Sequence, residues 1–347
     1  MQIVCVDPQS DNRWLQLLER YRSDAFHTPA WMSVLRETYD LEVSAYILLN
    51  EAGEPLAGLP FGRIADARGE RFVTLPFSDY CDPLVSDQDH WRCLVEPLLA
   101  EGRPFAIRCL HNSLPLADDR FIQVNKAKWH GLDLRPNADL LWQGLDSSVR
   151  RAVRKARQQG VSVQIAQGAE GLRAFFELHL GVRKYKYRLL AQPYRFFQSI
   201  WSHFIEQGCG ALMLAVYQGE IIGGVLFLEW KDRLYYKFNA SNPAWLSLRP
   251  NDLLIWEGMN YGRRKGYTLL DFGLSDWDQE GLVRYKRKFA TEEKTISFLQ
   301  YPPSVQVPQN ERHVQNLLPQ LTNLFTDPAV PDPVTEMAGE LLYGLFA

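Results

Sequence analysis

The chain has 347 residues, of which 46% are hydrophobic and 12% aromatic, and its formal net charge is −3. This length exceeds the usual range of one domain, and the apolar content suffices for two cores, so we expect two folded domains and no long disordered region. The five cysteines are scattered, odd in number and without metal-ligand spacing, which argues against a disulfide framework and a zinc site. Without a signal-peptide pattern or a long apolar stretch, a cytoplasmic protein is expected, with at most peripheral contact at the inner membrane face.

Charge is divided unevenly along the chain. Residues 141–300 carry 23 Lys and Arg against 15 Asp and Glu, whereas residues 1–140 carry 14 against 21. The basic segment indicates an anionic partner, and a nucleotide, a phosphorylated precursor and RNA all stay open. For any single cluster, a solvated surface is an equally good interpretation.

The first part of the chain predicts alternating strands and helices. In chain order we expect a strand at 2–6, helices near 11–20 and 30–38, three strands within 43–77, a helix at 88–101, and strands near 104–109 and 121–134. Polarity and charge change near Pro136–Gly144, so we place the domain boundary there and assign residues 1–140 to the first domain.

The second part predicts a longer series of elements. We expect a basic helix from Asp146 to Gln159, a strand at Val161–Ala166, helices near 169–182 and 193–206, strands at 211–217, 220–230 and 233–240, a helix at 251–265, and strands at 269–273 and 294–301. These form a second domain at 141–302. Apolar helices near 311–325 and 332–346 form a tail, 303–347, that we expect to pack on it.

The segment Leu269–Tyr301 carries the most specific motif. Its strand ends at Asp271-Phe272-Gly273, and a short helix with Tyr285-Lys286 follows. This pattern resembles the C-terminal signature of FemAB-like acyltransferases of the GNAT superfamily, which include exopolysaccharide and peptidoglycan-bridge proteins. The loop LPFSDYCDPL at 75–84 and the stretch LWQGLDSSVRRAVRKARQQGVSV at 141–163 look like further motifs of that family.

The resemblance implies a fold and an activity. The fold would be α/β, with tandem GNAT-like domains that each contain a mixed, mainly antiparallel sheet flanked by helices. The activity would be that of an N-acyltransferase, which passes an acyl or aminoacyl group to an amine of a cell-envelope or exopolysaccharide precursor. No Gly-x-Ser-x-Gly or HExxH motif is present, so direct attack without a covalent intermediate is the economical mechanism.

Three residues are the catalytic candidates. Asp271, at a strand end, would orient or deprotonate the acceptor, although a carboxylate there also bonds loop backbone readily. Lys286 would neutralise an acceptor phosphate or the oxyanion, and as a surface or cleft residue its change to alanine would lower turnover without changing the melting temperature. Tyr236 lies on the strand YYKFNAS, one face of which borders the expected cleft.

Further residues are candidates for substrate binding. Cations interleaved with aromatics at 183–188 suit a phosphorylated sugar or nucleotide, because guanidinium groups grip phosphate and rings stack on planar groups. The resemblance also implies that the loop at 75–84 approaches the acceptor, with a simple turn as the alternative. The expected acceptor-binding residues are Arg183, Lys184, Arg188, Asp79, Tyr80, Asn239, Ser275 and Tyr285.

The donor site is expected at the start of the helix at 251–265. Ser247–Asn251 replaces the glycine-rich turn of acyl-CoA enzymes, with Asn251 or Asp252 as N-cap and Arg249 placed to contact a phosphate. Acyl-CoA and aminoacyl-tRNA both stay open as co-substrates. We expect no bound cofactor or metal, and no DNA partner.

Departures from the family pattern keep a second function open. Phe289-Ala290 stands where the family typically has Trp-Gly, and Leu274 replaces a common arginine. A non-catalytic protein that binds an anionic saccharide or RNA on the same fold is therefore the alternative. For the basic helix at 146–159, we favour a solvated docking helix over a phosphate-binding one.

Overall fold

The computed structural model describes residues 1–302 and 309–347, which divide into two compact units. The first unit comprises residues 1–128, 294–320 and 344–347, and the second comprises residues 129–293 and 321–343. The division thus follows residue 128 rather than residue 140, and most of the last strand of the expected second domain belongs to the first unit. Residues 303–308 of the expected tail lie outside the described residues.

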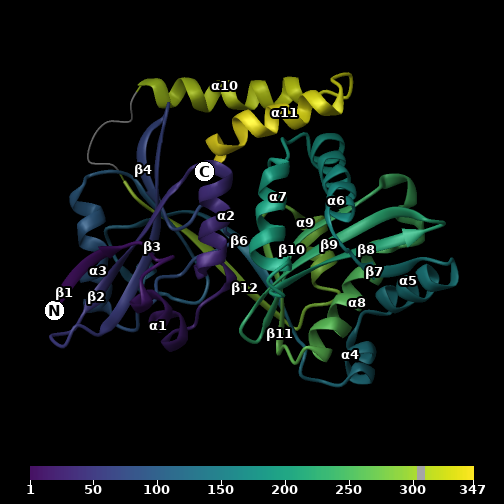
Figure 1. The fold of residues 1–347 in the computed structure, drawn as a ribbon, viewed down its shortest axis with the longest axis horizontal. Coiled ribbons are helices and arrows are strands. Elements are labelled where there is room, and N and C mark those ends of the chain that lie inside the picture. Colours follow the sequence, from purple (N-terminus) through teal and green to yellow (C-terminus); the bar gives the residue numbers. More distant parts are fainter. Residues whose placement is uncertain (303–308) are drawn as a thin grey trace. The chain divides into compact units, whose positions relative to one another are not determined.

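The first unit contains a mixed, mainly antiparallel sheet with helices, as predicted (Figure 1). Its strands, in spatial order, are β1 (Gln2–Val6), β2 (Glu42–Leu49), β3 (Pro55–Asp66), β4 (Gly69–Val73), β5 (Phe105–Cys109) and β12 (Glu292–Tyr301). Strand β4 pairs in parallel with β5, and the other neighbours are antiparallel. Its helices are α1 (Asn12–Arg20), α2 (Pro29–Tyr39) and α3 (Gln88–Ala100).

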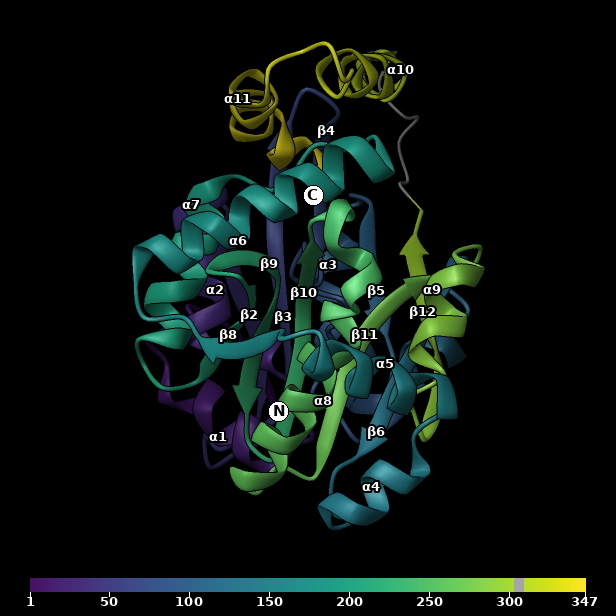
Figure 2. The ribbon, with the colours of Figure 1, turned by 90° about the vertical axis from the view of Figure 1, so that its right-hand side faces the viewer.

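The second unit repeats this mixture of strands and helices (Figure 2). In spatial order its strands are β6 (Ile122–Asp133, which belongs to this unit from Trp129 onward), β11 (Leu269–Asp276), β10 (Arg233–Ser241), β9 (Glu220–Trp230), β8 (Gly210–Tyr217) and β7 (Ser162–Ile165). Its helices are α4 (Ala138–Gly144), α5 (Ser147–Gln158), α6 (Ala169–Gly181), α7 (Tyr194–Ile200), α8 (Pro250–Arg264) and α9 (Glu280–Lys286). Gln218 and Gly219, with φ of 51° and 86°, form a tight turn between β8 and β9.

Helices cover both faces of the second unit's sheet. On one face, α5 and α8 bury Val153 and Met259 in a cluster with Phe227 of β9. On the other, Phe175 of α6 lies against Gly224 of β9, where an added Cβ would come within 2.7 Å of its ring. Because residues 224 and 227 of one strand point to opposite faces, this packing fixes which side of the sheet each helix covers.

The chain ends in two helices, α10 (Gln309–Phe325) and α11 (Asp332–Leu342), of which residues 321–343 belong to the second unit. Within that unit Arg173 of α6 pairs with Glu336 at 2.8 Å. Gly339 packs so closely that a Cβ would lie 2.5 Å from the Ala191 carbonyl oxygen. Residues 321–343 of the tail thus contact α6 and the segment at Ala191 of the second unit. Within the described residues, no helix combines the length and apolarity needed to cross a membrane.

Candidate active site

Strands β10 and β11 part from each other in the middle of the second unit. Their parallel ladder joins Arg233–Tyr235 to Leu269–Asp271, although β10 continues to Ser241 and β11 to Asp276. A β-bulge between Tyr236 and Phe238 bends β10 just where the ladder ends. Separated strands of this kind leave backbone groups to which a ligand can bond.

Two of the predicted catalytic residues bond to the same stretch of β11, which continues to Asp276 and does not end at Gly273 as expected. The Asp271 carboxylate accepts a hydrogen bond of 2.6 Å from the Gly273 N–H, and Lys286 Nζ donates to the carbonyls of Leu274, at 2.8 Å, and Gly273, at 3.4 Å. Gly273 has a φ of 62°, which favours glycine at this position. Ser275 follows on the same strand and is fully buried, with no hydrogen-bond partner for its Oγ within the described residues.

Lys286 is not a surface residue. Its exposed fraction is 4%, because α9 packs its side chain against β11. The expectation that its loss would leave the melting temperature unchanged is therefore wrong in its premise: removing the ammonium group would leave buried carbonyl oxygens without that donor.

The first turn of α8 differs from the predicted cap. The N-cap residue is Arg249, in the left-handed conformation with φ of 63°, and neither Asn251 nor Asp252 caps the helix. Instead the side-chain oxygen of Asn251 accepts hydrogen bonds from Asn239, at 3.2 Å, and Ser241. The two predicted residues Asn239 and Asn251 are thus in contact, and they tie β10 to α8.

A cavity of about 350 Å³ opens at this helix start. It is lined by Ser148, Arg151, Ala152, Lys155, Arg249, Asp252, Tyr285 and Lys288. Four of these eight residues are cationic and one is acidic. The start of a 15-residue helix adds the positive end of its dipole, so the cavity is suited to an anion.

Three titratable side chains interact at the cavity and behind it. Burial raises the pKa of Asp252, while Arg249 and Lys288 oppose that shift. Burial also raises the pKa of Tyr285, and Asp252 and Tyr236 add to the rise. Tyr236 is likewise shifted upward by burial, with a further contribution from Asp252. Both tyrosines therefore keep their protons at neutral pH, and the Tyr285 hydroxyl has no hydrogen-bond partner within the described residues.

The cations at 183–188 have another role than the one predicted. Lys184 is fully buried, and its Nζ donates to the Val330 carbonyl and to Asp332, the latter at 2.7 Å. Arg188 donates to the Thr326 carbonyl at 2.6 Å, and Arg183 to the Leu190 carbonyl at 2.9 Å. Backbone and carboxylate oxygens thus hold all three predicted cations. Lys184 and Arg188 connect residues 326–332 to the rest of the second unit.

Asp79 and Tyr80 belong to the first unit. Tyr80 is fully buried, and its hydroxyl lies 3.4 Å from Asp24 while its ring meets Phe26 edge-on. Tyr80 is therefore a core residue of that unit rather than an exposed ligand contact. Asp79, next to it, is partly exposed.

The functional residues that the sequence interpretation missed lie on α5. Val149, Val153 and Ala156 are buried on one face of this helix, as a docking helix requires. The opposite face does more than meet solvent, because Arg151 and Lys155 line the cavity at the start of α8. Their helical spacing, i and i+4, was the available signal, but nothing in the pattern identifies the neighbouring helix.

No group of His, Cys, Asp and Glu side chains in the described part of the chain is arranged to hold a metal ion. The arrangement offers a cationic cavity for an anion, the neutral phenol of Tyr285, the Asp252 carboxyl group with its raised pKa, and the separated strands β10 and β11. Together these could hold a phosphate-bearing ligand and exchange a proton beside it.

Part of the chain is similar to a known domain family. Residues 145–287 match the family model described as an acetyltransferase (GNAT) domain. No sequence among the curated proteins matches the chain.

Solved structures share the fold over most of the chain. FemX superposes with a TM-score of 0.67 at 16% sequence identity, covering 91% of this chain and 100% of that one. A tandem GNAT protein from the clavulanic acid biosynthesis pathway gives 0.56 at 13% identity, covering 88% and 100%. L-PGS from Bacillus licheniformis gives 0.55 at 13%, covering 93% and 99%. The predicted fold of tandem GNAT-like domains is therefore confirmed.

Proposed function

We propose that this chain, a FemAB-like acyltransferase of the GNAT superfamily, passes an acyl or aminoacyl group directly from a phosphate-bearing donor to an amine of a cell-envelope or exopolysaccharide precursor. The observation that carries the proposal is the cationic cavity of about 350 Å³ at the start of α8. Asp252 of its lining interacts electrostatically with Tyr236, the residue that follows the end of the β10–β11 ladder. Acyl-CoA and aminoacyl-tRNA both join phosphates to a reactive acyl group, so either is compatible with this cavity.

The donor's phosphates would lie among the four cations. Arg151 and Lys155 approach from α5, Arg249 from the helix start and Lys288 from the residues after α9. Guanidinium and ammonium groups bind phosphate through charge-assisted hydrogen bonds. Asp252 opposes an anion less than an ordinary aspartate would, because its raised pKa reflects an environment that disfavours its charged form.

The acyl group would then enter the parting between β10 and β11. The acceptor amine attacks the acyl carbonyl, the new C–N bond forms, and the bond to the donor sulfur or oxygen breaks. The amine loses one proton and the leaving group gains one. We assign the protonation of the leaving group to Tyr285. Its buried hydroxyl is protonated at neutral pH and has no hydrogen-bond partner within the described residues.

Asp271 and Lys286 act at the middle of β11 in this proposal. The Asp271 carboxylate remains our prediction for orienting the acceptor or taking its proton, with Asp252 as the other carboxylate near the site. Lys286 keeps the strand in place through the carbonyls of Gly273 and Leu274, and its charge would stabilise an oxyanion that forms there.

The test combines product detection with a matched pair of variants. The full chain would be incubated with acetyl-CoA or charged tRNA and a panel of amino-sugar and lipid-linked acceptors, and mass spectrometry would detect the acylated product. Arg151→Gln should raise the donor KM about fivefold, as expected for an ion pair worth up to ~1 kcal/mol at an exposed site. Arg154→Gln, on the same helix but outside the cavity lining, should leave it unchanged.

Two results would count against the proposal. An Arg151→Gln enzyme with the donor KM of the unchanged protein would place the donor elsewhere. No acylated product with any donor, together with tight binding of an anionic saccharide or RNA, would favour the non-catalytic alternative.

A further inference from the structure

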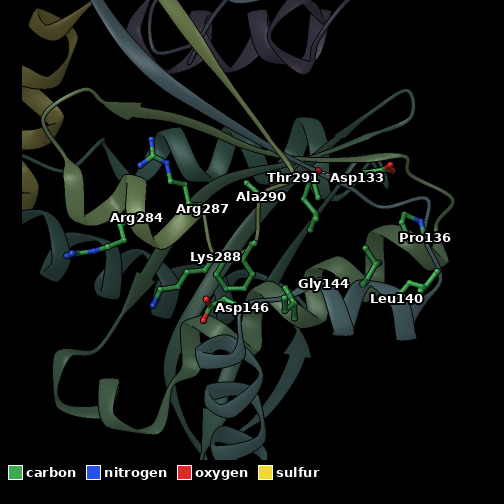
Figure 3. A pocket seen from close by; sticks show the side chains of 14 residues that line it. Asp133, Pro136, Leu140, Gly144, Asp146, Arg284, Arg287, Lys288, Ala290 and Thr291 are labelled. Atoms are coloured by element: carbon green, nitrogen blue, oxygen red, sulfur yellow. Dashed lines mark hydrogen bonds between the residues drawn. The ribbon is translucent and has the colours of Figure 1, made fainter.

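A second and larger cavity, of about 690 Å³, lies within the second unit between α4 and the segment that runs from α9 to Thr291 (Figure 3). Its wall is strongly apolar. Leu132, Leu141, Leu145 and Phe289 contribute buried side chains, and Leu140 stands at the opening with 56% of its surface exposed. An exposed leucine beside buried apolar side chains offers apolar surface that an occupant can remove from water.

Most charged residues at this cavity already have partners. Arg287 pairs with Glu293 at 2.7 Å, and Asp133 pairs with Arg135 at 2.8 Å. Asp146 accepts a hydrogen bond of 2.7 Å from the Ser148 N–H as the N-cap of α5.

Two further cationic side chains line this cavity. They are Arg284 and Lys288, and they make no ion pair within the described residues. Figure 3 shows Arg284 and Lys288 at one end of the cavity, with Pro136 and Leu140 at the other. Hydrogen bonds from Ser148 and, to a smaller extent, the Lys288 charge lower the pKa of Asp146 at the same end, and Lys288 also opposes the burial that raises the pKa of Asp252, so Lys288 is partly compensated. The positive charge of Arg284 therefore lies at one end of the cavity and the exposed apolar surface of Leu140 at the other.

We propose that this cavity binds an anionic amphiphile: an apolar chain on the leucines and Phe289, and a phosphate or carboxylate head reached by Arg284 and Lys288. Its volume is within the range of small-molecule sites, about 300–1,000 Å³. A free phosphate would leave the exposed Leu140 side chain in water, and a neutral chain would leave Arg284 without a counter-charge. The inference goes beyond acyl transfer and does not depend on it, because the lining residues alone define the ligand class.

The cavity adjoins the donor cavity through one residue. Lys288 lines both, so an anionic head held here would lie beside the proposed donor phosphates. A lipid-linked saccharide phosphate and a water-borne acyl phosphate share this chemistry.

The experiment measures binding, not turnover, so its result is independent of the proposed donor reaction. Decyl phosphate, kept below its micelle-forming concentration, would be titrated into the full chain by calorimetry. Inorganic phosphate and the neutral octyl glucoside would be titrated in parallel. We expect saturable binding of decyl phosphate that is at least tenfold tighter than that of either comparison compound.

Variants at the two ends of the cavity locate the ligand. Arg284→Gln should weaken decyl phosphate about threefold to tenfold, because an ammonium or guanidinium bond to phosphate is lost. Leu140→Ser should weaken it several-fold through lost apolar contact. The matched controls are Arg264→Gln at the end of α8 and Leu341→Ser on α11, both exposed and outside the cavity lining, and both should bind as the unchanged protein does.

Three binding results would contradict the proposal. Equal affinity for inorganic phosphate, equal affinity for octyl glucoside, or an affinity that neither Arg284→Gln nor Leu140→Ser changes would overturn the proposal. Flotation with phosphatidylglycerol vesicles then identifies the source of the ligand. Binding to vesicles that requires Leu140 assigns a membrane-resident amphiphile, and binding to decyl phosphate alone assigns a water-borne one.

Discussion

Replacing Tyr285 by phenylalanine separates the function of its hydroxyl from its structural cost. The hydroxyl is buried without a hydrogen-bond partner in the described residues, and mutational data put the cost of such a group at about 1–3 kcal/mol. Tyr285→Phe keeps the ring, which lies 5.4 Å from Phe289. The variant should therefore be as stable as the unchanged protein or more stable, by about 1 kcal/mol, which corresponds to about 2–4 °C for a unit of 150–250 residues.

Turnover should move in the opposite direction. Loss of a general acid lowers kcat about 100-fold or more, equivalent to ~2.7 kcal/mol of barrier. The assay follows the release of free coenzyme A thiol or deacylated tRNA, and calorimetry gives the melting temperature. Tyr261→Phe is the matched control, because its hydroxyl donates to Glu229 at 2.5 Å in a structural contact: stability should fall and kcat should not. A Tyr285→Phe enzyme with unchanged kcat/KM would refute the assignment of the proton source.

Three further predictions concern charged groups. Lys286→Met should lower the free energy of unfolding by about 1–3 kcal/mol, measured by urea denaturation, because the carbonyls of Leu274 and Gly273 lose a donor; an unchanged midpoint would show that water replaces the ammonium group. Although partial burial acts the other way, hydrogen bonds from Lys184 and Tyr185 lower the pKa of Asp332, so this contact stabilises the fold above about pH 4 and is lost as pH falls below that value. Asp332→Asn should therefore lose less stability than the unchanged protein between pH 5 and pH 2, and parallel curves would contradict the pairing. Donor binding should weaken as salt rises, steeply for charged tRNA and shallowly for acetyl-CoA, and affinity indifferent to salt would remove the cavity's cations from donor binding.

The order of strands and helices was largely predictable because its signals are local. The helix expected at 88–101 is α3 at Gln88–Ala100, and the strands expected at 211–217, 220–230 and 233–240 are β8 to β10, each within one residue of its predicted bounds. The short helix α4 was missed, since its seven residues fall where the change in polarity and charge was taken as a boundary. The sequence predicted strand β12 at its position in the chain, but it could not predict that β12 pairs with β5. Antiparallel partners so far apart in the chain carry no shared local pattern.

The candidate site was predictable only where one segment builds it. Asp271, Gly273 and Lys286 lie within sixteen residues of each other in one motif, although β11 continues past Gly273 to Asp276. Residues of α5, α8 and the end of α9 together line the anion cavity. The sequence pattern of one helix does not indicate which other helices lie beside it. The residues at 183–188 were misleading for the same reason. The carbonyls of Val330 and Thr326 accept from Lys184 and Arg188, and that of Leu190 accepts from Arg183; a backbone carbonyl has no sequence signature.

The pairing of β12 with β5 has a consequence for how the chain folds as it is made. Residues 297–301 complete the first unit's sheet, yet a ribosome adds them only after every residue of 129–293. Until then β5 has an unpaired edge, which is a template for pairing with another chain. A fragment that stops at residue 140 should for this reason aggregate or remain partly unfolded, and the early chain needs protection from neighbouring nascent chains until β12 emerges.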